Sequence, residues 1–430
     1  MKTNYIMVTV AIGIVLALIL YAPSHPNATP PKKVLPVRPK KITPTAPFVY
    51  HHSNPALRQL LEEYETFLRE ALGNKLAPGI AVAIIKDTSI VYLKGFGIRD
   101  EHAKDTVDIH TVFRIASVSK CFASLLTGIL VDEQKLCWDD PVIKYLPGFK
   151  LKSEEYTRSL TLRHVLSHTI GLPYHAFTDR VDAGANFDSL VYHLRDLDLV
   201  SKPGELYSYQ NVGYSLIGQV IQAATGKTYI ENLKEKIFDR LHMQSASATY
   251  KAITQSNDFA MPHGYAKSWV PVPISDTYYD VAPAGGINAS IADMARWLLA
   301  MTSDPQKILK QETEEEIFHP MVRAISRNRY FWRWKPLRSA YYALGWRVLN
   351  FRNDTLAYHG GYVNGYRSEV AIDRKDKLAI CVLVNAAGTL ADISVPRFFE
   401  LYSRHREAID CWEKEQAESV ASRESLVHSP

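Results

Sequence analysis

Strand-like runs near both ends of the chain, separated by a long helical stretch, constrain the fold more than any other feature. Residues 79–98 (GIAVAIIKDTSIVYLKGFGI) contain two β-rich runs around a polar turn, which is typical of a hairpin. Four further strand-like runs near the C-terminus predict an antiparallel meander: 343–350, 355–358, 366–373 and 378–385. If both groups pair in one sheet, the helical middle is an insertion and the cleft beside it is a natural pocket. We therefore expect an α+β fold, an antiparallel β-sheet flanked by helices with a large, mostly helical inserted subdomain.

Helices are expected around these strands. A polar helix should cover about 55–72, and the apolar spacing after Ser117 predicts an amphipathic helix there. Ser290 and Asp293 have the spacing of a capping box at the start of another helix. A last helix near 395–408 should precede a polar tail that is frayed or disordered from about Glu413.

The N-terminal segment indicates where the protein is located. Residues 6–22 (IMVTVAIGIVLALILYA) carry no charge and would span roughly 25 Å as a helix, just short of a bilayer core. We expect an uncleaved membrane anchor; a cleaved signal peptide and a buried core helix are the alternatives. Residues 23–47 contain eight prolines, which is typical of an extended spacer. The folded body would then lie outside the cytoplasm, on the periplasmic or extracellular side, or be secreted if the segment is cleaved.

This organisation predicts four regions. They are the anchor or signal sequence (1–22), a Pro-rich basic linker (23–47), the folded domain (48–408) and a polar C-terminal tail (409–430). A transporter or other polytopic protein is excluded, because only one segment is long and apolar enough to span a membrane.

Charge excludes a general nucleic-acid binder. The 430 residues carry a net charge of +5, but the first 47 residues alone carry +6, which leaves the body at −1. DNA- and RNA-binding proteins present a basic face, so we expect no nucleic-acid partner.

Metal-binding patterns are weak. The four cysteines have no metal-finger spacing, and we expect Cys121 and Cys381 to be small core residues. His164 and His168 have the i, i+4 spacing of zinc ligands, but no H-E-x-x-H glutamate lies between them. We expect no metal site. The run 323–338 (RAISRNRYFWRWKPLR) could touch a membrane, an anionic polymer or a pocket entrance, although a solvated insertion with aromatic packing is the simpler interpretation.

Three short motifs could carry chemistry. Ser117 and Lys120 stand one helical turn apart at a predicted helix start, where a lysine of lowered pKa could activate the serine and a backbone N–H could receive an oxyanion. Tyr209 and Asn211 lie in a later loop, where the tyrosine could share proton transfer and the asparagine could hold both lysine and substrate. Each motif alone is unspecific.

The third motif is His359-Gly360-Gly361, at the end of a predicted strand, where glycines allow a substrate backbone to lie against the strand edge. In this order the motifs S-x-x-K, Y-x-N and [K/H]-x-G resemble the penicillin-recognising serine hydrolases. The tyrosine in the second motif is similar to the class C β-lactamase branch, which includes D-Ala-D-Ala carboxypeptidases, D-aminopeptidases, family VIII esterases and mitochondrial β-lactamase-like proteins. The resemblance covers about 50–405 and extends to three supporting stretches: 162–173 (LRHVLSHTIGLP), 283–286 (PAGG) and 342–348 (YALGWRV).

The resemblance implies roles for these residues. Ser117 would be acylated, Lys120 and Tyr209 would form the acid/base pair, and Asn211 would position the reacting groups. The oxyanion hole would lie at the backbone N–H groups of Ser117 and Tyr362. His359, Gly360, Gly361 and Tyr362 would complete the catalytic and substrate-binding site, and no cofactor or metal is implied.

Two departures concern the substrate. His359-Gly360-Gly361 replaces the Lys-Thr-Gly usual in β-lactamases, which removes from the motif a fixed positive charge and a hydroxyl suited to a carboxylate. Ile170 stands where the family usually has serine, so that loop is expected to differ.

We therefore predict a membrane-anchored serine hydrolase that forms an acyl-Ser117 intermediate on a small-molecule or peptide substrate. An amide or ester would be cleaved, as by a DD-peptidase, D-aminopeptidase or esterase, with at most weak β-lactamase activity. The alternative is a noncatalytic relative used for binding, sensing or self-assembly. The sequence leaves the oligomeric state open.

Overall fold

A computed structural model describes residues 53–102, 104–303, 308–324 and 331–427, with side chains up to 419. Within these residues eight strands form one sheet in the order β2-β1-β12-β11-β10-β9-β8-β7, with antiparallel neighbours throughout. The strands of this sheet are β1 (Gly79–Lys86), β2 (Ser89–Gly97), β7 (Val322–Arg323), β8 (Leu337–Tyr342), β9 (Arg347–Phe351), β10 (Asp354–Val363), β11 (Tyr366–Asp373) and β12 (Leu378–Val384). The predicted α+β fold is confirmed.

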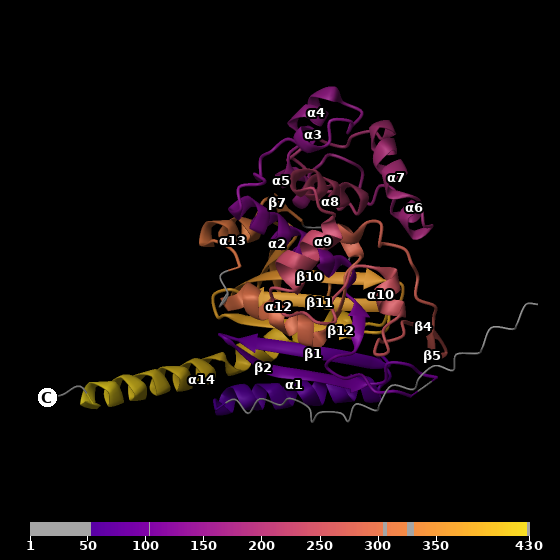
Figure 1. Cartoon of the computed structure of the whole chain (residues 1–430). Helices are drawn as coiled ribbons and strands as arrows, with labels where there is room; N and C mark the ends of the chain where they lie inside the picture. The colour runs from indigo at the N-terminus through magenta and orange to yellow at the C-terminus, as the bar shows by residue number, and fades with distance from the viewer. Residues whose placement is uncertain (1–52, 103, 304–307, 325–330, 428–430) are drawn as a thin grey trace, which may run out of the picture. The chain divides into compact units, whose positions relative to one another are not determined.

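Both ends of the chain contribute to this sheet (Figure 1). The hairpin β1–β2 joins the C-terminal meander through β1 and β12, whose register runs from Ile80 opposite Val384 to Lys86 opposite Leu378. The one-sheet arrangement makes the helical middle of the chain an insertion between β2 and β7.

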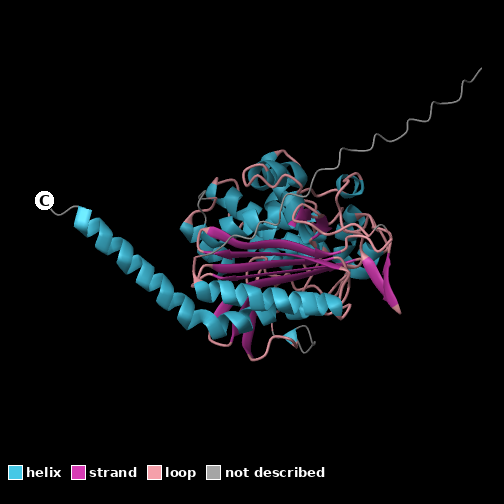
Figure 2. Cartoon of the chain, turned by 90° about the horizontal axis from the view of Figure 1, so that it is seen from below, coloured by secondary structure: helices cyan, strands magenta, loops and turns pink. Residues whose placement is uncertain are grey.

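The sheet is buried on both faces. In β1, Ala81, Ala83 and Ile85 belong to the apolar core on the side of α2 and α12, whereas Ile80 and Val82 belong to the core under α1 and α14. Successive strand residues point to opposite faces, so a strand covered on both sides is a continuous apolar run. Figure 2 shows α1 and α14 together on one face of the sheet.

Helices cover the two faces and build the insertion. They are α1 (Pro55–Gly73), α2 (Ser119–Asp132), α3 (Val142–Tyr145), α4 (Glu154–Ser159), α5 (Leu162–Leu166), α6 (Thr178–Asp182), α7 (Phe187–His193), α8 (Val212–Thr225), α9 (Tyr229–Leu233), α10 (Tyr250–Thr254), α11 (Ala282–Gly285), α12 (Ile291–Ser303), α13 (Gln311–Phe318) and α14 (Leu390–Val427), with short turns η1 (Ala116–Val118), η2 (Leu194–Asp196) and η3 (Lys234–Phe238). Two small pairs complete the fold: β3 (Val112–Arg114) with β6 (Asn288–Ser290), and β4 (His263–Ala266) with β5 (Ser268–Pro271).

Local sequence signals explain several boundaries. Asn54 caps α1 by accepting the N–H groups of Ala56 and Leu57. The capping box at α12 is confirmed, because Ser290 and Asp293 each accept the other's backbone N–H through their side chains, at 3.1 and 3.2 Å.

Two expectations differ from the structure. Residues 343–346 form a turn before β9 instead of a strand, because Ala343 N–H bonds back to Trp346 O. The tail expected to fray from about Glu413 continues α14 to Val427, and Glu413 forms an ion pair with Lys86 at 3.4 Å.

The expected anchor and linker, residues 1–47, lie outside the described residues. In the part of the chain that the structure describes, no helix is both long and apolar enough to cross a bilayer.

Candidate active site

Ser117 lies in the tight turn η1, between strand β3 and helix α2. Strand β3 leads into η1, and α2 follows directly, so the serine is held at the start of a buried helix. Ala116 has φ of 48°, a left-handed conformation that an alanine rarely adopts. Such local strain persists only where surrounding contacts hold it, and here it turns the partly exposed Ser117 toward the cleft.

Lys120 is fully buried beside this serine. Its Nζ lies 3.3 Å from Ser117 Oγ, 2.9 Å from Asn211 Oδ1 and 2.8 Å from Ala284 O. The Tyr209 ring lies under the same amine, with 4.6 Å between Nζ and the ring centroid. The structure thus brings together four residues from two separate chain segments and adds the carbonyl of Ala284 from a third.

The surroundings of Lys120 favour a neutral amine. Burial, and then the nearby Arg347 cation, hold the pKa of Lys120 well below its usual value. A neutral amine has two N–H groups and one lone pair. Asn211 Oδ1 and Ala284 O accept the two N–H groups, which leaves the lone pair directed at the Ser117 hydroxyl.

The loop that carries Tyr209 and Asn211 is fastened to the LRHVLSHTIGLP stretch. Ser208 N–H donates to His168 O at 2.8 Å, and Gln210 N–H donates to His168 Nδ1 at 3.1 Å. The Tyr209 ring packs on the His168 ring with 4.3 Å between centroids. His168 therefore positions the loop. His164 has a different role, because its Nδ1 accepts the Thr161 N–H in the capping box at the start of α5.

Strand β10 presents an open edge to the site. Its pairing with β9 ends where Tyr358 lies opposite Arg347, so residues from Gly360 to Val363 line the cleft. A Cβ atom on Gly361 would lie 2.6 Å from Ile115 O and 2.9 Å from Ser117 N, which only glycine permits. This contact brings the backbone of Ser117 next to Tyr362, the two residues expected to form an oxyanion hole.

His359 does not line the cleft. It is a fully buried residue of β10 whose Nδ1 lies 3.0 Å from Gly360 O and whose Nε2 lies 3.0 Å from the Tyr342 hydroxyl. Burial, and then the Arg347 cation, lower the pKa of His359 well below its ordinary value. Its neutral ring supports the strand.

Arg347 restores a positive charge that the third motif lacks. It lines the cleft from the start of β9, and its Nη1 lies 3.2 Å from His359 Nε2. The motif itself has no fixed cation, but the cleft has one, because Arg347 comes from the neighbouring strand. Arg347 stands in the YALGWRV stretch, but its placement beside His359 depends on strand register, which the sequence does not reveal.

The cleft has a volume of about 690 Å³ and is lined largely by aromatic residues. Sequence reasoning identified Tyr209 and Tyr362 but missed the other aromatic side chains, which come from loops scattered over the chain. The missed aromatic residues are Tyr174, Tyr207, Tyr278, Phe331, Trp332 and Tyr358. Trp332 places part of the run 323–338 at this cleft, as one of its interpretations proposed.

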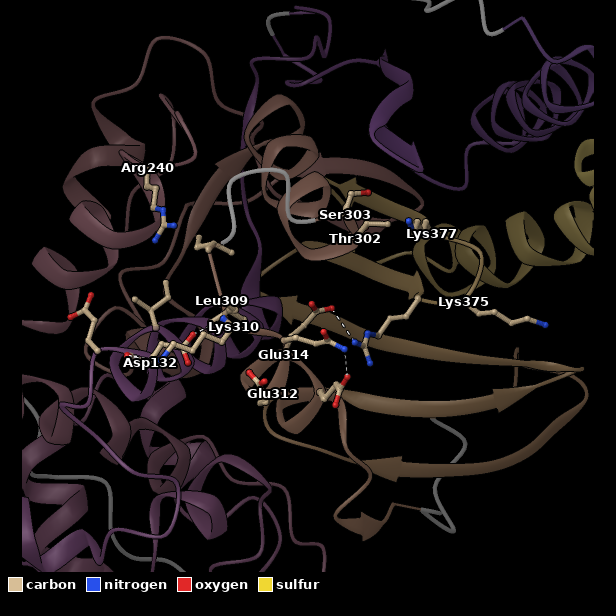
Figure 3. A pocket seen from close by; sticks show the side chains of 16 residues that line it. Asp132, Arg240, Thr302, Ser303, Leu309, Lys310, Glu312, Glu314, Lys375 and Lys377 are labelled. Atoms are coloured by element: carbon tan, nitrogen blue, oxygen red, sulfur yellow. Dashed lines mark hydrogen bonds and ion pairs between the residues drawn. The ribbon is translucent and has the colours of Figure 1, made fainter. Parts of the chain in front are cut away.

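A second cavity, of about 1260 Å³, lies near α13 and the β11–β12 turn. Figure 3 shows charged side chains of both signs around it, including Asp132, Arg240, Glu314 and Lys375. Thr302 and Ser303 line it together with three lysines, but their hydroxyls donate to the backbone carbonyls of Leu298 and Asp87. Neither hydroxyl is therefore hydrogen-bonded to a lysine amine, as Ser117 is in the first cleft. No cluster of three or more metal-ligating side chains occurs among the described residues.

Comparisons with known proteins agree with this architecture. The protein Flp of Staphylococcus aureus (strain NCTC 8325 / PS 47) is 25% identical over 331 residues, which are 75% of this chain and 63% of Flp. The unguisins hydrolase UngD′ of Aspergillus campestris is 24% identical over 72% of this chain and 59% of its own length. This chain therefore matches less than two thirds of each of these relatives.

A solved structure, the octameric penicillin-binding protein homologue from Pyrococcus abyssi, superposes with a TM-score of 0.68 and 27% identity. The match covers 80% of this chain and 76% of the homologue. The sequence profile of the Beta-lactamase family matches residues 64–398, which include all three motifs. The chain therefore belongs to the β-lactamase family.

Proposed function

We propose that this protein is a serine hydrolase that cleaves an amide or ester through an acyl-Ser117 intermediate. One observation carries the proposal: the buried Lys120 amine, of lowered pKa, has its two N–H groups satisfied by Asn211 and Ala284 and its lone pair near Ser117 Oγ. That arrangement suits a general base better than it suits a lysine with a purely structural role.

In the proposed first step, Ser117 Oγ attacks the substrate carbonyl carbon while its proton moves to Lys120 Nζ. The carbonyl oxygen becomes an oxyanion beside the backbone N–H groups of Ser117 and Tyr362. The bond to the leaving group then breaks, and the leaving nitrogen or oxygen takes the proton from Lys120, with Tyr209 beside the path. Water attacks the acyl ester by the same route, which releases the acid and restores Ser117.

The open edge of β10 and the charge of Arg347 suggest how a substrate is held. An extended amide can lie along Gly360 to Tyr362, and an anionic substrate group can pair with Arg347. We therefore place the substrate among peptide-like amides and esters, as for a DD-peptidase, D-aminopeptidase or esterase, with weak β-lactamase activity at most. The name of the relative UngD′, a hydrolase, supports hydrolysis as the reaction class.

We also propose that residues 6–22 anchor the protein in a membrane, with the catalytic body outside the cytoplasm. The support is the uncharged apolar run and the Pro-rich spacer that follows it. Membrane fractionation of the full chain and of a chain lacking residues 1–22 tests this proposal. Release of the shortened chain to the soluble fraction supports an anchor, whereas a full chain found soluble and shortened by proteolysis indicates a cleaved signal.

Intact-protein mass spectrometry tests the catalytic proposal. The protein is exposed separately to a penicillin, a p-nitrophenyl ester and a fluorophosphonate, beside the Ser117→Ala variant. We expect a mass addition from at least one probe that is absent from the variant. A lasting penicillin adduct would indicate a peptidase-like site, and rapid ester turnover an esterase-like site.

A folded protein that none of the three probes labels would contradict hydrolysis and favour the noncatalytic alternative. Circular dichroism of the same sample shows whether it is folded, so that this outcome is not confused with misfolding.

A further inference from the structure

Three exposed aromatic side chains converge on the cleft that contains Ser117. Tyr174 is 50% exposed, Trp332 47% and Tyr362 60%, and all three line this cleft. They come from the loop after α5, the segment before β8 and the end of β10. Single exposed aromatic residues are ordinary on a protein surface. Several that meet at one concave site form a contiguous apolar surface whose hydration is unfavourable, and such surfaces mark binding sites.

Less exposed aromatic rings line the same cleft. Tyr207 stacks on the buried Tyr342 with 5.3 Å between ring centroids. Phe331, beside Trp332, packs edge-on against Tyr358 at 6.5 Å. Tyr207, Phe331 and Tyr358 therefore add ordered aromatic rings to the lining of the same cleft, and such rings lose little conformational freedom when a ligand contacts them.

The charged residues of the cleft are mostly engaged with one another. Arg367 forms an ion pair with Asp392, and Asp182 is hydrogen-bonded to the hydroxyl of Tyr278. The aromatic mouth therefore differs from the polar centre, where Arg347 lies near the reacting groups.

We infer that the substrate carries a flat aromatic group, or an apolar group of similar size, that stacks on Tyr174, Trp332 and Tyr362. This inference rests on the proposed hydrolysis at Ser117 and names the class of substrate: amides and esters with an aryl group near the scissile carbonyl. Aromatic stacking is sensitive to the loss of a single ring, and removal of one ring should weaken binding about 3- to 10-fold.

Binding is measured first, in a protein that cannot form an acyl-enzyme. Calorimetric titration of 1-naphthylacetamide into the full-length Ser117→Ala protein should show saturable binding. Adding Tyr174→Ala or Trp332→Ala to this protein should raise Kd about 3- to 10-fold. Tyr192→Ala is the matched control, because Tyr192 is 56% exposed and is not among the residues that line this cleft.

Catalysis is measured second, with the intact site. The kcat/KM ratio for ethyl phenylacetate over ethyl acetate, followed by acid release, should exceed 10 and should fall about 3- to 10-fold in Tyr174→Ala and Trp332→Ala but not in Tyr192→Ala. Circular dichroism checks that each variant is folded.

The two proposals fail in different ways. No saturable binding of 1-naphthylacetamide, or equal affinities in the Tyr174→Ala, Trp332→Ala and Tyr192→Ala proteins, overturns the aromatic subsite even if the esters are hydrolysed. Ring-dependent binding without hydrolysis of either ester leaves the subsite in place and overturns the proposed hydrolysis.

Discussion

At the scale of single residues, the charge state of Lys120 depends on Arg347. The two come from α2 and β9, and the Arg347 cation disfavours a second positive charge in the same buried site. Burial lowers the pKa of Lys120 most, and the guanidinium has two further roles in the proposed enzyme: it adds to this lowering and offers a positive charge to the substrate.

Arg347→Met tests this coupling. Loss of the cation raises the pKa of Lys120, so the acidic limb of the pH dependence of fluorophosphonate labelling should move to higher pH, and labelling at pH 7 should slow. Arg347→Lys keeps the charge and should leave the limb near its original position. If the acidic limb of the labelling curve lies at the same pH in Arg347→Met and in the native protein, Arg347 does not influence the pKa of Lys120.

The left-handed backbone at Ala116 is a second feature at this scale. Glycine adopts φ of 48° without steric cost, so Ala116→Gly should leave the free energy of unfolding unchanged or raise it by up to about 1 kcal/mol. The same change at Ala295, inside α12, should lower it by about 1 kcal/mol. Urea denaturation measures both, and equal destabilisation at the two positions would argue against strain at Ala116.

At the scale of elements, the site depends on the close approach of β10 to η1. Ser368 on β11 donates its hydroxyl to Ile115 O at 2.5 Å, and Gly361 lies between this bond and Ser117. The strand and the turn are thus fastened together at the point where the oxyanion would form.

Gly361→Ala should break this arrangement. The new methyl group would lie 2.4 Å from Ser368 Oγ, so β10 must move away from η1, at a cost of about 1–3 kcal/mol in the free energy of unfolding. Fluorophosphonate labelling should also slow. Gly148→Ala is the control, because no atom lies within 4 Å of its added methyl group, and it should change neither property. Normal labelling of folded Gly361→Ala would contradict the proposed oxyanion geometry.

At the scale of the whole molecule, buried charges link the cleft to the helix on the far face of the sheet. Arg367 on β11 forms ion pairs with Glu369, at 2.9 Å, and with Asp392 in the first turn of α14. Arg367 and Asp392 line the cleft, so the position of α14 and the shape of the substrate site are coupled.

Glu369 makes folding sensitive to pH. Burial raises its pKa from 4.5 to about 7, so the folded protein binds this proton more tightly than the unfolded chain does. The stabilisation from this group is complete below about pH 4.5 and is lost as the pH rises through about 7. In chemical denaturation, Glu369→Gln should therefore gain up to about 3 kcal/mol relative to the native protein between pH 5 and pH 8.

The exposed Glu312→Gln is the control for this experiment and should leave the pH dependence of stability unchanged. Parallel stability curves for Glu369→Gln and the native protein would show that Glu369 does not bind the proton more tightly in the folded state.

The features that depend on local sequence patterns could be predicted before the structure was known. Apolar runs and turn residues predicted the hairpin and most of the meander, helical spacing predicted α1 and α2, and the order of three motifs predicted the family. These signals lie within a few residues of one another, where backbone geometry and side-chain periodicity act directly.

The features that depend on contacts between residues far apart in the sequence became visible only in the folded chain. Strand register brought Arg347 beside the fully buried His359, which restored a charge that the motif lacks. Three-dimensional packing likewise gathered Tyr174, Trp332 and Tyr362 into one cleft mouth. The physical reason is that burial and charge–charge interaction depend on distance in space, which local sequence patterns do not encode.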